Sequence, residues 1–177
     1  MFENPSPLMT YYGRKQNQGA IEALLRRTKY DLSVTLNSNN PITHWGIRHK
    51  YGQLIARLDC ALLGPNWYRR GDDRLFGLAF LENRETNMHL HAVLRLPRCP
   101  MRRLKMPIEE LIDYYWRRLV RGGSADVQWI TDQGRVIRYV TKQLWRPQHP
   151  ELYFITTEFH PQGTSGPRPP LPRAGQP

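Results

Sequence analysis

The stretch 88–96 reads MHLHAVLRL, and its alternating side chains predict a β-strand, because residues two apart in a strand share a face. The stretch 75–81 before it, LFGLAFL, predicts a second, buried strand. Between the two strands lies the polar run ENRETN at 82–87. Two strands joined by a loop of about four to six residues predict a β-hairpin, and we expect this hairpin to lie at the centre of the fold.

The segments on both sides of the hairpin alternate between strand and helix patterns. Before the hairpin, YDLSVTL at 30–36 predicts a half-buried strand, and 42–63 predicts a helix. After the hairpin we expect a helix over 107–120, a strand over 125–131, a helix over 132–145 and an edge strand over 153–159. This order predicts an α+β sandwich in which helices pack on one face of an antiparallel sheet.

The chain has 177 residues, which is enough for one domain with a sizeable core. Residues 1–20 are mostly polar, and we expect them to form a flexible lead-in. Residues 161–177, PQGTSGPRPPLPRAGQP, are rich in proline and glycine and predict a disordered tail. The folded domain is therefore expected over 21–160.

The charge balance points to an anionic partner. The 26 lysines and arginines exceed the 15 acidic residues, for a formal net charge of +11. Nucleic acid is the first candidate partner and an anionic membrane surface the second. Tyrosines and tryptophans lie between the basic residues along the chain, and such rings can stack on unpaired bases.

Several features favour a cytoplasmic protein. The mean hydropathy is −0.64, and no run of 18 apolar residues is present, so no transmembrane helix is expected. The N-terminal stretch lacks the apolar region of a secretory signal. Cys60 and Cys99 are too few for a disulfide framework, which is consistent with a reducing compartment.

The pair His89 and His91 is the sharpest local motif. Both imidazoles project from one face of the predicted strand, where packing alone explains them poorly. A divalent metal ion would satisfy both rings, with an acidic or polar side chain as a third ligand. Glu82 is the best candidate because it ends the preceding strand, and Glu85 and Asn87 are the alternatives.

The predicted last helix carries a tyrosine on a basic face. At 100° per residue, four side chains fall within about 60° of one another: Arg135, Tyr139, Lys142 and Arg146. The opposite, buried stripe is expected to contain Val136, Val140 and Leu144. A phenol is a poor nucleophile, but nearby cations favour its phenolate form and can also hold a phosphate.

The polar face of the first strand completes the pattern. Asp31, Ser33, Thr35 and Asn37 alternate with apolar residues and could line the same surface as the histidines. A metal-binding pair, a polar strand face and a tyrosine followed by a lysine fit metal-assisted transesterification of DNA. Such a reaction leaves a 5′-phosphotyrosyl enzyme and a free 3′-hydroxyl.

Three motifs, YDLSVTLN, MHLHAVLRL and RYVTKQL, resemble those of the HUH endonuclease superfamily in type and in order. The likeness is greatest to the single-tyrosine initiators of rolling-circle replication, and it covers most of residues 30–146. It implies a ferredoxin-like or RNA-recognition-like core with a five-stranded antiparallel sheet. It also implies nicking and joining of single-stranded or hairpin-exposed origin DNA.

The resemblance assigns roles to individual residues. It implies Mg²⁺ or Mn²⁺ held by His89, His91 and Glu82, with Tyr139 as the nucleophile and Lys142 positioning the phosphate. The expected DNA contacts are Arg135, Arg138, Arg146, Thr35 and Asn37.

Two departures limit the mechanism. Position 143 is Gln, so a second catalytic tyrosine is not supported, and no G-x-x-x-x-G-K-[ST] run occurs. We therefore expect a host helicase and a host polymerase as partners.

Three alternatives stay open from the sequence. The first is a single-tyrosine transposase of the same superfamily, which would excise and join element ends. The second is a non-catalytic nucleic-acid binder that uses the sheet face, as RNA-recognition modules do. The third is a basic structural protein such as a packaging factor.

Overall fold

The computed structural model describes residues 18–71, 73–82, 88–98, 104–142 and 153–159. The predicted tail over 161–177 lies outside the described residues. The predicted lead-in over 1–20 also lies outside them, except for its last three residues. These three belong to a helix over 18–26.

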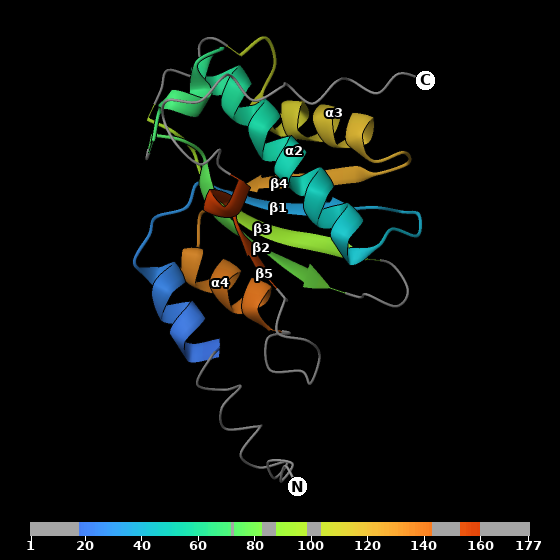
Figure 1. Ribbon diagram of the computed structural model, residues 1–177. Coiled ribbons are helices and arrows are strands. Elements are labelled where there is room, and N and C mark those ends of the chain that lie inside the picture. Colours follow the sequence, from blue (N-terminus) through green and yellow to red (C-terminus); the bar gives the residue numbers. More distant parts are fainter. Residues whose placement is uncertain (1–17, 72, 83–87, 99–103, 143–152, 160–177) are drawn as a thin grey trace, which may run out of the picture.

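The sheet has five strands in the order β4-β1-β3-β2-β5, and all neighbouring strands are antiparallel (Figure 1). The strands are β1 (Leu32–Asn37), β2 (Phe76–Glu82), β3 (His89–Arg95), β4 (Ser124–Trp129) and β5 (Tyr153–Ile155). The β2–β3 hairpin lies inside the sheet, as predicted. This architecture confirms the α+β prediction and is consistent with a ferredoxin-like sandwich.

Two long helices cover one face of the sheet and enclose the larger core (Figure 1). They are α2 (His44–Leu63) and α3 (Ile108–Leu119). The Thr43 side chain caps α2 by accepting a hydrogen bond from the Gly46 N–H, and Gly64 ends this helix with a positive φ of 84°. Trp116 of α3 is fully buried, and its indole N–H donates to the Asn37 carbonyl at 2.7 Å.

A buried ion pair joins α2 to the segment that leads into β2. The Arg74 guanidinium donates to Asp59 Oδ2 at 2.8 and 3.0 Å, and the Leu75 N–H donates to Asp59 Oδ1 at 2.9 Å. Burial raises the pKa of Asp59, although Leu75 and Arg74 act in the opposite direction. The ion pair and its hydrogen bonds fix the start of the strand that ends at Glu82.

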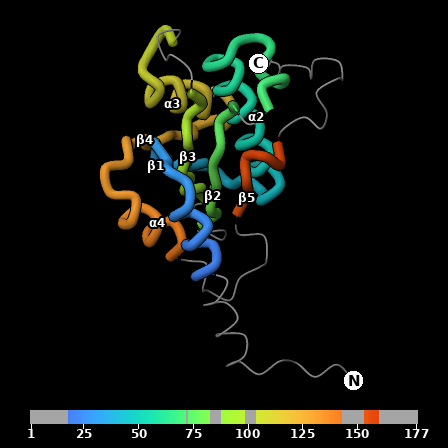
Figure 2. The backbone as a smooth tube through the Cα atoms, turned by 90° about the vertical axis from the view of Figure 1, so that its left-hand side faces the viewer, coloured from blue at the N-terminus to red at the C-terminus, as the bar shows by residue number. Residues whose placement is uncertain are grey.

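The opposite face of the sheet is also covered by helices, so the expectation of helices on one face only is wrong. The helix α4 (Gln133–Thr141) and the helix over 18–26 lie on this side (Figures 1 and 2). Their apolar residues form a second, smaller core with the sheet: Leu25, Tyr30, Leu78, Phe80, Val93, Ile137 and Val140. Because β2 and β3 carry apolar side chains on both faces of the sheet, both faces must be covered.

Several predicted elements differ from the structure by one or two residues at an end, and the predicted edge strand differs most. The strand expected over 153–159 is limited to β5, because the chain turns into the short 3₁₀ helix η3 (Thr156–Phe159). The turn is fixed by Glu158, whose carboxylate accepts the Ile155 N–H at 2.8 Å. The helix expected over 132–145 is described to Thr141, and 143–145 lie outside the described residues. None of the described helices combines the length and the apolar character that crossing a membrane requires.

Candidate metal centre beside a tyrosine helix

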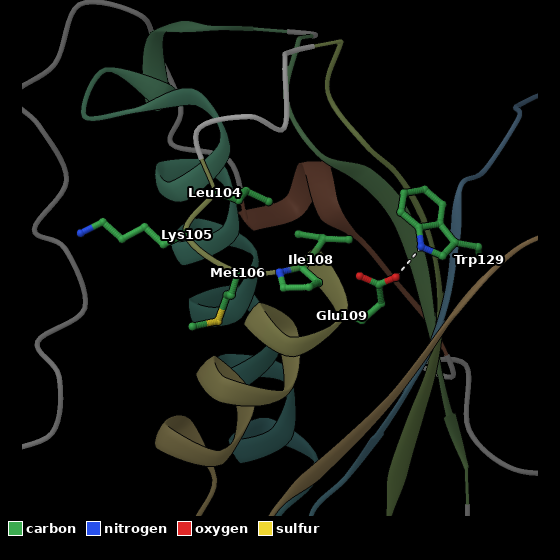
Figure 3. Close-up of a pocket in the computed structure, with 7 residues that line it drawn as sticks. Leu104, Lys105, Met106, Ile108, Glu109 and Trp129 are labelled. Atoms are coloured by element: carbon green, nitrogen blue, oxygen red, sulfur yellow. Dashed lines mark hydrogen bonds between the residues drawn. The ribbon is translucent and has the colours of Figure 1, made fainter.

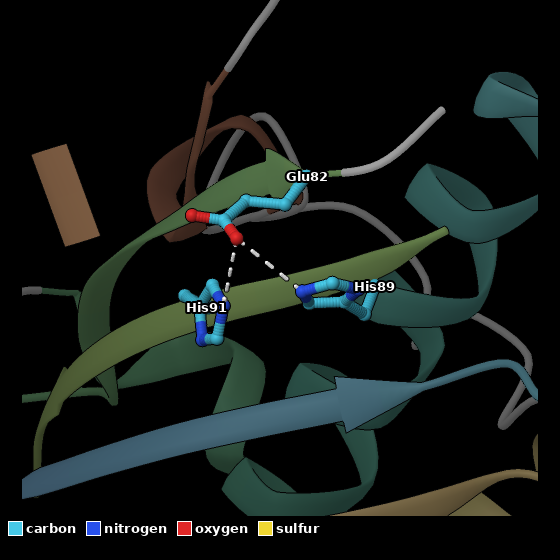
Figure 4. A group of neighbouring side chains, drawn as sticks. All are labelled: Glu82, His89 and His91. Carbon is cyan, nitrogen blue, oxygen red and sulfur yellow. Dashed lines mark ion pairs between the residues drawn. The ribbon is translucent and has the colours of Figure 1, made fainter. Parts of the chain in front are cut away.

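The β2–β3 hairpin brings two histidines and a glutamate together. Glu82 lies directly opposite His89, and His91 lies opposite Phe80 on the same face, so all three functional side chains project toward α4. Glu82 Oε2 is 3.4 Å from His89 Nε2 and 3.2 Å from His91 Nε2. Figure 4 shows the carboxylate of Glu82 directed at both imidazoles. One ligand atom from each residue lies within 4.8 Å of the others, so this group could hold a metal ion.

Glu82 is the third ligand that this arrangement supports. The two alternatives, Glu85 and Asn87, lie outside the described residues. The position of Glu82 follows from the pairing of the hairpin, since the last residue of β2 faces the first residue of β3.

The chemistry of this group fits a cation. Glu82 and His91 are each only 4% exposed. Among the described residues, Glu82 Oε1 and His91 Nε2 are buried without a hydrogen-bond partner of normal geometry. Burial alone raises the pKa of Glu82, but contacts with His89 and His91 and the charge of Lys142 outweigh it. The pKa of this carboxyl is therefore held well below its usual range.

Thr35 of β1 orients one of the histidines. Thr35 lies opposite His91 in the β1–β3 ladder, and its Oγ1 is 3.0 Å from His91 Nδ1. If Nδ1 carries the proton, it donates to Thr35 and leaves Nε2 free for a metal. Asn37, two residues further on, lies opposite His89. The predicted polar face of β1 therefore borders the metal group, and Thr35 makes a direct contact with it.

Tyr139 and Lys142 of the predicted tyrosine helix also reach this group. The Tyr139 ring meets the His91 ring edge to face, with centroids 4.9 Å apart, and its side chain is 48% exposed. Lys142 Nζ lies 3.8 Å from the centroid of the Tyr139 ring and 3.5 Å from Glu82 Oε1. Residues from β2, β3 and α4 thus meet at one place.

The remaining predictions for the last helix are mixed. Arg135 and Arg138 are exposed, as a DNA-binding face requires, whereas Arg146 lies outside the described residues. The buried residues of α4 are Ile137, Val140 and Thr141. The predicted stripe is therefore right at Val140, but Val136 is only partly buried, and Leu144 lies outside the described residues.

A separate hollow has a volume of about 330 Å³. Residues 104–109 and Trp129 line it, and the Trp129 indole N–H donates to Glu109 (Figure 3). Trp129 lies opposite Leu32 on the α2/α3 side of the sheet, whereas the metal group lies on the α4 side. The hollow is therefore separate from the candidate metal centre.

Comparison with known proteins adds no assignment. No family model, no curated protein and no solved structure matches the chain. The sequence reasoning missed the helix over 18–26 and the pairing of Thr35 with His91. The apolar residues of that helix, such as Leu24 and Leu25, were a weak signal within a polar segment.

Proposed function

We propose that this protein nicks and rejoins single-stranded DNA by metal-assisted transesterification, with Tyr139 as the nucleophile. The observation that carries the proposal is the meeting of Tyr139 and Lys142 with the group Glu82, His89 and His91. Packing alone does not explain why Tyr139 lies beside the metal ligands, because about half of the residue is exposed. The net charge of +11 supports an anionic substrate.

The proposed metal is Mg²⁺ or Mn²⁺, held by His89, His91 and Glu82. A phosphate oxygen and a carboxylate are hard oxygen ligands of the kind these ions prefer. When bound, the ion would supply the positive charge that polarises the scissile phosphate.

The residues of the chain carry out the transfer step. The Tyr139 hydroxyl oxygen attacks phosphorus in line, and the bond from phosphorus to the 3′ oxygen breaks. The phenol proton passes to solvent, and the departing 3′ oxygen takes up a proton, so the step is balanced. Lys142 supports the reaction because its ammonium group lies beside the ring of Tyr139, where negative charge develops when the hydroxyl loses its proton. Reversal of the same step with a free 3′-hydroxyl rejoins the strand.

The biological setting that we propose is the initiation of rolling-circle replication of a plasmid, phage or mobile element in the cytoplasm. The first-strand motif YDLSVTLN and the lysine three residues after Tyr139 support an initiator over a single-tyrosine transposase. A host helicase would expose the origin, and a host polymerase would extend the free 3′-hydroxyl.

Covalent capture tests the proposal. Because the protein becomes joined to the 5′ phosphate of the downstream fragment, a random-sequence single-stranded pool labelled at its 3′ end transfers label to the protein. We expect a labelled adduct on a denaturing gel with Mn²⁺ and none with EDTA. Tyr139→Phe abolishes the adduct, whereas Tyr114→Phe retains it. Tyr114 is a matched control, because it is 44% exposed and lies on α3.

Three outcomes decide between the readings. An adduct that persists in Tyr139→Phe contradicts the assigned nucleophile. No adduct from any pool, together with DNA binding that EDTA leaves unchanged, identifies a non-catalytic binding module instead. Excised circles and joined element ends, rather than origin nicking, would identify a transposase.

A further inference from the structure

Two arginines from different helices converge beside the first turn of α4. A β-carbon placed on Gly134 would lie 3.6 Å from Arg138 Nη1 and 3.8 Å from Arg26 Nη1. Both guanidinium groups therefore lie within 4 Å of one point. Arg26 is the last residue of the helix over 18–26, so the two positive charges come from segments far apart in the sequence.

The Gln133 side chain holds these two segments together. Its Nε2 donates to the carbonyls of Thr28 at 2.8 Å and Leu25 at 3.4 Å, which flank Arg26. Its Oε1 accepts the N–H of Tyr30 at 3.1 Å. At the other end of α4, the Thr141 hydroxyl donates to Glu22 Oε1 at 3.0 Å. Both ends of α4 are thus bonded to the helix that carries Arg26 or to the residues just after it, so the fold holds the two guanidinium groups near each other.

The positive charges at this place exceed the negative charge. Asp132 Oδ1 lies 3.4 Å from the same point and caps α4 by accepting the Arg135 N–H, so one carboxylate lies beside two guanidinium groups. In the described part of the chain, neither Arg26 nor Arg138 forms an ion pair, and both side chains are exposed. The net positive charge that remains favours the binding of a further anion.

We propose that Arg26 and Arg138 form a phosphate-binding cleft for the backbone of single-stranded DNA. This inference rests on the proposed function, because it extends the path of the strand away from Tyr139. Gly134 and Tyr139 are five positions apart on α4, about 7.5 Å along the helix axis and about 140° around it. A strand that contacts both the tyrosine and the two arginines would therefore pass over the exposed side of α4, where Arg135 also lies. The guanidinium fork suits a phosphate oxygen and is indifferent to the base sequence.

Salt dependence of binding tests the cleft without requiring catalysis. The binding of a fluorescent oligothymidylate of about 20 nucleotides is measured by anisotropy in EDTA, in a Tyr139→Phe background, over a series of salt concentrations. Each phosphate contact contributes about −0.7 to the slope of log K against log salt. We expect Arg26→Ala to reduce that slope by about 0.7, Arg26→Ala/Arg138→Ala to reduce it further, and Arg26→Lys to retain it.

Arg117→Ala is the matched control, because Arg117 is exposed and pairs with Asp113 on α3, which covers the other face of the sheet. We expect this variant to keep the original slope. Equal slopes for Arg26→Ala and Arg117→Ala, with normal thermal unfolding of both, would overturn the cleft. Since binding is read without metal or nucleophile, a failure of wild-type nicking would count against the proposed function and would leave this result standing.

Discussion

On the α2/α3 side of the sheet, apolar side chains from β1, β2 and β3 pack against two long helices. On the α4 side, the described residues contribute seven buried apolar side chains to a smaller core, and the hairpin carries Glu82, His89 and His91 beside it. The first side holds a complete buried ion pair, Asp59 with Arg74, although the Tyr51 hydroxyl is buried there without a hydrogen-bond partner among the described residues. On the second side, Glu82 Oε1 and His91 Nε2 lack a hydrogen bond of normal geometry, and both belong to the group that could hold a metal ion. We therefore expect the first side to contribute most of the stability, and the second side to carry the proposed chemistry.

The strongest loss of stability is expected from a substitution on the α2/α3 side of the sheet. Trp116→Ala removes a fully buried indole and leaves the Asn37 carbonyl without its donor. We expect the free energy of unfolding to fall by about 3–5 kcal/mol, measured by urea denaturation. The folded fraction should bind Mn²⁺ with an affinity within a few-fold of wild type. A loss of stability below about 1 kcal/mol would show that this side is not the main source of stability.

The next effect concerns the chemical side. Glu82→Gln keeps the shape of the side chain but removes the charge that binds the metal. We expect Mn²⁺ affinity, measured by titration calorimetry, to fall by more than about 100-fold, beyond the range found for residues that only orient ligands. Glu158→Gln is the control, since Glu158 pairs with Arg48 away from the metal group. Equal affinities for wild type and Glu82→Gln would exclude Glu82 as a ligand.

The same variant has a pH signature in the absence of metal. Because the pKa of Glu82 is lowered from 4.5 in the folded state, its ionised form stabilises the fold above pH 4.5. This contribution is lost as the pH falls below 4.5 toward the lowered folded pKa. Glu82→Gln should therefore lose stability less steeply than wild type over that acid range, as measured by urea denaturation at each pH. Parallel curves would contradict the lowered pKa.

The hairpin and its histidine pair could be predicted because alternation alone puts His89 and His91 on one face, whatever the strand register. The third ligand depends on register, so Glu82 could only be ranked against Glu85 and Asn87 from the sequence. The order of the elements was also sufficient to predict the α+β class. Each of these predictions rests on local pattern.

What could not be predicted depends on long-range contacts. Gln133 joins α4 to Tyr30, which is 103 residues away in the chain, and no local pattern indicates that bond. The helix over 18–26 shields α4 from a second direction, which is why Ile137 and Thr141 are buried beside Val140. The predicted stripe assumed that α4 is covered only by the sheet, and it therefore contained only some of the residues that are buried.

A weaker effect on metal binding is expected from β1, whose side chains face both sides of the sheet. Thr35→Val keeps the size of the side chain but removes the hydroxyl that lies 3.0 Å from His91 Nδ1. Without this acceptor, the tautomer with Nε2 free is no longer favoured, and we expect Mn²⁺ affinity to fall by about 10–100-fold with little loss of stability. Ser33→Ala is the matched control, because Ser33 projects from the same face of β1 but lies opposite Val93. If the two variants bind Mn²⁺ equally well, Thr35 does not orient His91, and only the β2–β3 hairpin contributes to metal binding.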